Sequence, residues 1–86
     1  MIDIEELNEI EIAVLRAMHS RAVYGKNHKR IETIIHSGFP SHLRNEVKKA
    51  ILSLIKKGYI LWYHTADKSI HLNKELYSEI DRIVRS

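Results

Sequence analysis

Histidines and isolated carboxylates are the residues of this sequence that could support metal or acid–base chemistry. None of the six histidines forms an H-x-x-x-H pair. A two-residue turn at Asp67-Lys68 would place His64 directly opposite His71 across a hairpin, but a one-residue change in loop length separates their faces. We therefore regard His64 and His71 as weak metal candidates and expect two surface histidines.

Motifs for catalysis are also missing. There is no G-x-S-x-G, no cysteine, and the three glycines are isolated at positions 25, 38 and 58, which excludes a glycine-rich phosphate loop. Glu32 and Glu46 could meet in space, but lone glutamates near arginines are typical of surface charges or ion pairs. We expect no enzyme, no cofactor and no ligand pocket.

The strongest chemical signal is a basic middle segment. The net charge of +3 is made of −5 in residues 1–15, +8 in residues 16–58, where ten bases meet two acids, and zero in residues 59–86. Such a distribution is typical of a nucleic-acid-binding surface, although solvated helix faces give the same charge. The placement of these residues on the fold must decide between the two.

Length and composition predict one domain covering residues 1–86. An 86-residue chain that is 44% hydrophobic and 29% charged can enclose one core and not two. Its first residues are acidic where a signal peptide is basic, and it has no apolar run of about 20 residues. We expect a cytoplasmic protein that does not enter the membrane.

Hydrophobic periodicity predicts four helices and a hairpin, a mainly α fold with a small β-hairpin, of the α+β class. The helices are expected at about 4–19, 28–37, 41–57 and 74–85, the hairpin at 59–72, and a short strand at 22–24. Gly38 is expected to end the second helix as a left-handed C-cap, and Ser41 to cap the third, which stops at Gly58. Asn73 is a predicted N-cap for the last helix.

The order helix, turn, helix, hairpin resembles the winged helix-turn-helix family, including small archaeal members. The resemblance covers residues 4–72 and rests on Ser37-Gly38-Phe39-Pro40-Ser41 and on a second stretch, Ala50-Ile51, Leu54 and Gly58-Tyr59-Ile60. The second stretch resembles the family's Ala-Leu-x-x-Leu-x-x-x-Gly-x-Ile signature, with Ile51 at the first Leu position. It implies that the helix at 41–57 enters the major groove of double-stranded DNA while the hairpin touches the flanking backbone or minor groove. The expected function is that of a transcriptional regulator.

Helical spacing nominates the residues for this contact. Asn45 suits adenine edges and Arg44 suits guanine, whereas Lys48 and Lys49 suit phosphates. Lys29 and Arg30, at the expected start of the second helix, are candidates for backbone contacts. The full set of DNA-binding candidates is Lys29, Arg30, Ser41, His42, Arg44, Asn45, Lys48, Lys49 and Lys68.

Apolar residues outside the expected core keep other partners open. Leu52 and Ile55 flank the buried stripe; internal packing is expected, and a second subunit is the alternative. The C-terminal helix, with Ile80, Ile83 and Val84, either packs on the first helix or forms a homodimer seam.

Two further kinds of partner remain as alternatives. The same fold also serves as a protein-binding or assembly module. Tyr59, Trp62 and Tyr63 are expected to pack, with stacking on single-stranded nucleic acid or RNA as the minor alternative.

Overall fold

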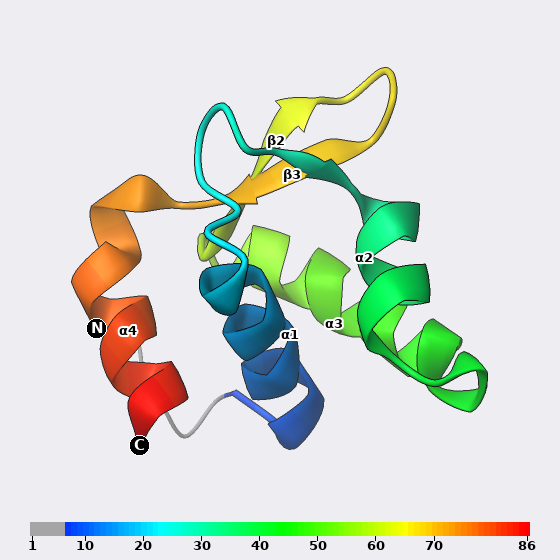
Figure 1. Cartoon of the computed structure of the whole chain (residues 1–86), viewed down its shortest axis with the longest axis horizontal. Coiled ribbons are helices and arrows are strands. Elements are labelled where there is room, and N and C mark those ends of the chain that lie inside the picture. Colours follow the sequence, from blue (N-terminus) through cyan, green and yellow to red (C-terminus); the bar gives the residue numbers. More distant parts are fainter. Residues whose placement is uncertain (1–6) are drawn as a thin grey trace.

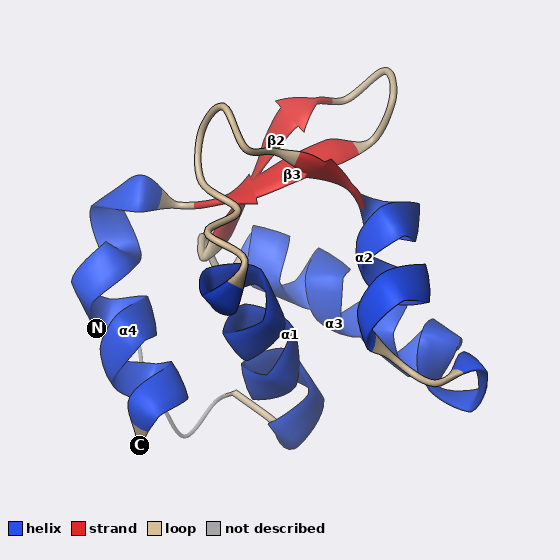
Figure 2. Ribbon diagram, in the orientation of Figure 1, coloured by secondary structure: helices blue, strands red, loops and turns tan. Residues whose placement is uncertain are grey.

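The computed structural model describes residues 7–86 and has an α+β fold, with helices on one side of a small antiparallel sheet (Figures 1 and 2). The elements follow the order α1 (Glu9–Ser20), β1 (Lys29–Arg30), α2 (Ile31–Gly38), the 3-10 turn Ser41–Leu43, α3 (Arg44–Lys56), β2 (Ile60–His64), β3 (Ser69–Leu72), the 3-10 turn Lys74–Leu76 and α4 (Tyr77–Arg85). The strand order in the sheet is β1-β3-β2. Within the described residues no helix is long and apolar enough to cross a membrane.

Helix α1 begins at Glu9, later than the predicted start at residue 4. Residues 4–6 of the predicted range lie outside the described residues, and Leu7 and Asn8 precede the helix. The Asn8 side chain accepts the Glu11 N–H at 2.8 Å, and the Glu11 carboxylate accepts the Asn8 N–H at 2.8 Å. This reciprocal capping box fixes the start because it satisfies two N–H groups that have no partner within the helix.

The segment before α2 differs from the prediction. Lys29 and Arg30, expected in the helix, form strand β1 and pair with Ile70 and Ser69 of β3. The strand predicted at 22–24 is reduced to one bridge between Tyr24 and Leu72. A two-residue strand has no hydrophobic period, so only its partner strand reveals it.

The turn between α2 and α3 is made differently from the prediction. Gly38 is the last helical residue and has no left-handed φ; the chain leaves the helix through extended Phe39, with φ −141°. Ser41 makes no side-chain capping hydrogen bond and begins a 3-10 turn that continues into α3. At the other end the prediction is confirmed, because Gly58 follows α3 with φ +90°, a conformation that favours glycine.

The hairpin register rules out the paired histidines. Four residues, 65–68, connect β2 to β3, so His64 pairs with Ser69 while His71 pairs with Leu61. A bulge between Trp62 and His64 shifts the register of the two strands further. Over residues 7–86 no group of three or more metal-ligating side chains could hold a metal ion.

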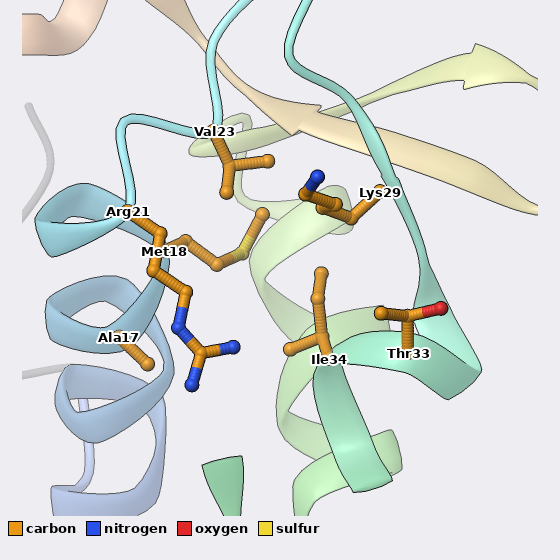
Figure 3. A pocket seen from close by; sticks show the side chains of 7 residues that line it. All are labelled: Ala17, Met18, Arg21, Val23, Lys29, Thr33 and Ile34. Carbon is orange, nitrogen blue, oxygen red and sulfur yellow. The ribbon is translucent and has the colours of Figure 1, made fainter. Parts of the chain in front are cut away.

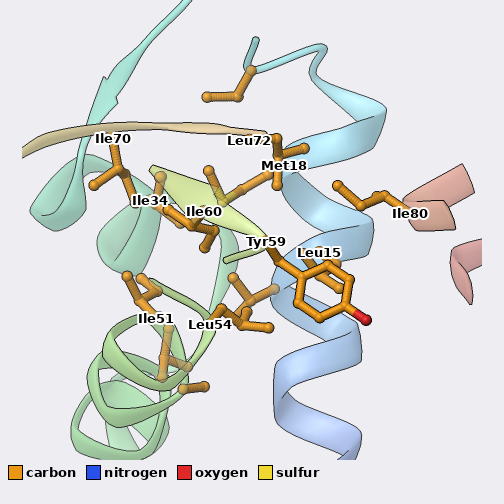
Figure 4. Packing of buried hydrophobic residues seen from close by; sticks show 14 of the residues in the cluster. Leu15, Met18, Ile34, Ile51, Leu54, Tyr59, Ile60, Ile70, Leu72 and Ile80 are labelled. Carbon is orange, nitrogen blue, oxygen red and sulfur yellow. The ribbon is translucent and has the colours of Figure 1, made fainter. Parts of the chain in front are cut away.

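A single hydrophobic core joins α1, α2, α3, the sheet and α4 (Figure 4). Leu15, Ile51, Leu54, Ile60 and Leu72 are among its fully buried members. Asn73 caps the turn before α4 as predicted, by accepting the Glu75 N–H.

Helix α4 lies beside α1, and its apolar face is used within the chain (Figure 1). Ile80 and Ile83 are buried in the common core and Val84 packs against it. These residues therefore no longer support a homodimer seam. Ile55 is packed internally as predicted, but the prediction was wrong for Leu52, which is 47% exposed.

Candidate nucleic-acid interface

A basic groove runs between α3, α2 and the β2–β3 turn. One hollow of this groove is lined by Arg44, Asn45 and Lys48 of α3 together with Lys68 of the turn. An adjoining hollow is lined by Arg30 and again by Lys68. We call Arg30, Arg44, Asn45, Lys48 and Lys68 the basic groove; all five are exposed.

Helical geometry explains why α3 contributes three of these side chains. Val47, Ile51 and Leu54 point into the core, which leaves Arg44 and Lys48, one turn apart, on the flank next to α2. Asn45 stands beside them. The N-terminal half of α3 thus presents two cations and one amide on the same side as the β2–β3 turn.

Lys29 and Arg30 lie on different sides of β1. Because successive strand residues point to opposite faces, Arg30 joins the groove while Lys29 points toward the space between α1 and α2 (Figure 3). There it lines a cavity of about 40 Å³ with Met18 and Ile34, room for little more than a water molecule.

The remaining predicted contacts lie outside the groove. Lys49 is exposed but faces the α1 side, where it lines a hollow with Asn8 and Ile10. Ser41 and His42 are exposed in the 3-10 turn that leads into α3. The structure therefore brings five of the nine predicted residues together and spreads the other four around them.

Two acids interrupt the positive charge of the groove. Glu32 lines both hollows from α2, and Asp67 lies in the turn next to Lys68. The Ser69 hydroxyl donates to Asp67 at 2.6 Å and the Ser69 N–H at 3.1 Å; these bonds hold the pKa of Asp67 below its usual value. Asp67 therefore stays ionised and shapes the turn, whereas Glu32 has no such partner among the described residues.

Removing the charge of Glu32 should strengthen the binding of a polyanion. We expect Glu32→Gln to raise the affinity for random duplex DNA about two- to fivefold, since it removes repulsion equivalent to roughly one exposed charge pair. Fluorescence anisotropy at low salt measures the change. Glu75→Gln, which removes an exposed acid near α4, is the matched control and should change the affinity much less. An equal gain from both variants would mean that only net charge matters.

A buried carboxylate ties α3 to α1. Glu11 is 1% exposed, and its carboxylate accepts hydrogen bonds from the Ser53 hydroxyl at 2.7 Å and from the Lys57 ammonium at 3.0 Å. Burial alone would raise the pKa of Glu11, but the hydrogen bonds from Asn8, Ser53 and Lys57 outweigh it and lower the pKa. Sequence reasoning counted Glu11 only within the −5 charge of residues 1–15 and missed this link.

Edge strand β2 exposes an apolar row that was also missed. Tyr59 is buried as predicted, but Leu61, Trp62 and Tyr63 are 38–40% exposed, so the packing prediction was wrong for Trp62 and Tyr63. The Tyr63 ring stacks on His28, with ring centroids 3.8 Å apart. The sequence signal was present in three consecutive large apolar residues, which cannot all face the core from one strand.

Comparison of the chain with protein-family models, curated protein sequences and solved structures found no match.

Proposed function

We propose that this chain is a winged helix-turn-helix protein that binds double-stranded DNA and acts as a transcriptional regulator. Helix α3 is the recognition helix in this proposal, α2 crosses the DNA backbone, and the β2–β3 hairpin is the wing. The observation that carries the proposal is the basic groove, in which two cations and an amide of α3 share one surface with Arg30 and Lys68. Helix α1, with its acids, lies on the other side of α3 from this groove.

Each groove residue has a role in the proposal. Arg44 and Asn45 stand near the N-terminal end of α3, where a recognition helix meets base edges, and their side chains suit guanine and adenine respectively. Lys48, Arg30 and Lys68 are assigned to phosphates, which position the protein without reading sequence. All of these proposed contacts come from protein side chains, so we expect DNA binding to need no metal or cofactor.

Mapping of the DNA-bound surface tests the proposal. On adding a random 20-base-pair duplex at low salt, amide signals of residues 41–48 and 66–68 should shift in NMR spectra, while those of α4 should not. Absence of shifts, or shifts concentrated on α4, would contradict the proposed face.

A protein-binding module is the second candidate. The exposed row Leu61, Trp62 and Tyr63 favours it, because an edge strand with apolar side chains is suited to pairing with another chain. In the same titration this function predicts no response to duplex DNA.

Asn45 provides a test of base readout. Asn45→Ala should reduce discrimination at one base pair by about 1–3 kcal/mol, because a bidentate amide–adenine contact is lost. Affinities for a selected target and for its single-base variants measure this effect. An equal loss on every sequence would make Asn45 a phosphate contact instead.

A further inference from the structure

An open hollow lies on the other side of the molecule from the basic groove, where α4 approaches the loop after α1. Its lining consists of Tyr24, Gly25 and Lys26 from the loop and of Lys74 and Tyr77 from the segment that leads into α4. It has a volume of about 670 Å³, within the range of small-molecule sites.

The aromatic walls of the hollow are held in fixed positions. The Tyr24 hydroxyl lies 2.9 Å from His19 Nδ1, and His19 Nε2 lies 2.8 Å from Asp81. Burial is the main cause that raises the pKa of Tyr24 to about 12, so its hydroxyl is a proton donor at neutral pH. Because Asp81 accepts from His19 Nε2 and the Tyr24 hydroxyl shares a hydrogen bond with His19 Nδ1, both nitrogens of the His19 ring are engaged and the three side chains form one chain of hydrogen bonds.

The second ring and the loop backbone complete a preformed site. The Tyr77 ring lies against Tyr24 and His19, with centroid separations of 5.4 and 5.1 Å, yet Tyr77 is 51% exposed. The Gly25 N–H donates to His71 Nδ1 at 3.3 Å, which ties the loop to β3. Because its two neighbours already hold the exposed Tyr77 ring in place, the ring offers a ligand a flat surface and loses little conformational entropy on binding.

The charge of the hollow is positive. Lys26 and Lys74 line it, and no acid does. Neither ammonium group forms an ion pair with any residue between 7 and 86. Two unpaired cations beside two tyrosine rings favour a ligand that combines a flat apolar body with negative charge.

We propose that this hollow, which we call the tyrosine site, binds a small planar aromatic anion, with the ring against Tyr24 and Tyr77 and the carboxylate or phosphate on Lys26 and Lys74. The site is separate from the basic groove, so the proposal stands whether or not the chain binds DNA. Sequence reasoning expected no ligand pocket. It could not find this hollow, since His19 and Asp81 lie 62 residues apart along the chain and no spacing connects them.

An NMR titration with 2-naphthoate tests the tyrosine site, with neutral 2-naphthol as the ligand control. We expect 2-naphthoate to shift the amide signals of Gly25, Lys26 and Tyr77 with a Kd of about 0.1–1 mM. The Lys26→Ala, Lys74→Ala double variant should bind about tenfold more weakly. Tyr77→Ala should also weaken binding. Because Tyr77 is half exposed, this variant should stay folded, which a thermal melt checks.

The matched control is Lys49→Ala with Lys56→Ala, which removes two exposed lysines of α3 outside the basic groove and should leave the affinity for 2-naphthoate unchanged. Three results would overturn the proposal: no shifts at Gly25 and Tyr77 with millimolar 2-naphthoate, equal binding of 2-naphthol, or equal weakening by the two lysine pairs.

Discussion

Replacing Arg44 and Lys48 together by glutamate should lower the affinity for random-sequence duplex DNA by at least about 50-fold near 0.1 M salt. The phosphate contact of Lys48 contributes a factor of about eight at this salt concentration through counterion release, the guanidinium of Arg44 is lost from the same surface, and the two introduced acids add repulsion. Both side chains are exposed on α3, so the domain should stay folded. Anisotropy measures the affinity, and circular dichroism checks the fold.

The charge-matched control is Lys74→Glu with Arg82→Glu, which changes the net charge equally on the side of α4. This control should change the affinity for duplex DNA by no more than about threefold. Exposed charges on the side of α4 that lie farther from the DNA than a Debye length of about 10 Å are largely screened. Single variants sharpen the comparison: Lys48→Glu should weaken binding more than Lys49→Glu, since Lys49 faces α1 and not the groove. If all these variants lose affinity equally, the binding depends on net charge and not on the proposed face.

Glu11→Ala should lower the free energy of unfolding by about 2–3 kcal/mol. The substitution leaves the Asn8 N–H and the Ser53 hydroxyl without their acceptor and removes the partner of the Lys57 ammonium. Urea denaturation measures the loss. Glu9→Ala, an exposed acid in the same first turn, should cost no more than about 0.5 kcal/mol; similar losses for both variants would show that only the helix dipole matters.

The same carboxylate predicts a pH dependence. Because the pKa of Glu11 is lowered on folding from an ordinary value of 4.5, its contribution is fully present above that value and is lost as the pH falls through the lower folded-state pKa. The difference in unfolding free energy between the wild type and Glu11→Gln should therefore shrink below about pH 4.5. A difference that stays constant from pH 7 to pH 3 would contradict this.

Periodic elements could be predicted from the sequence, and contacts between distant residues could not. The apolar spacing of Val47, Ile51 and Leu54 located α3, and Gly58 located its end, because both are local effects. Strand β1 has only two residues and exists through its pairing with β3, so no local pattern indicates it.

The candidate site, too, could be predicted only where it depends on local sequence. The helical spacing placed Arg44, Asn45, Lys48 and Lys49 on one exposed surface. Only the position of α2 and of the β2–β3 turn shows that Lys48 lies in the groove and Lys49 outside it. The pairing of Glu11 with Lys57 likewise depends on how α1 crosses α3, which composition and periodicity do not specify.

The salt dependence of binding to random-sequence duplex DNA tests the central claim most directly, because it requires no knowledge of a target sequence. With Arg30, Lys48 and Lys68 of the basic groove on phosphates, log affinity should fall with log salt at a slope of about −3. No binding at about 50 mM salt, or a slope near zero, would contradict DNA binding through this groove.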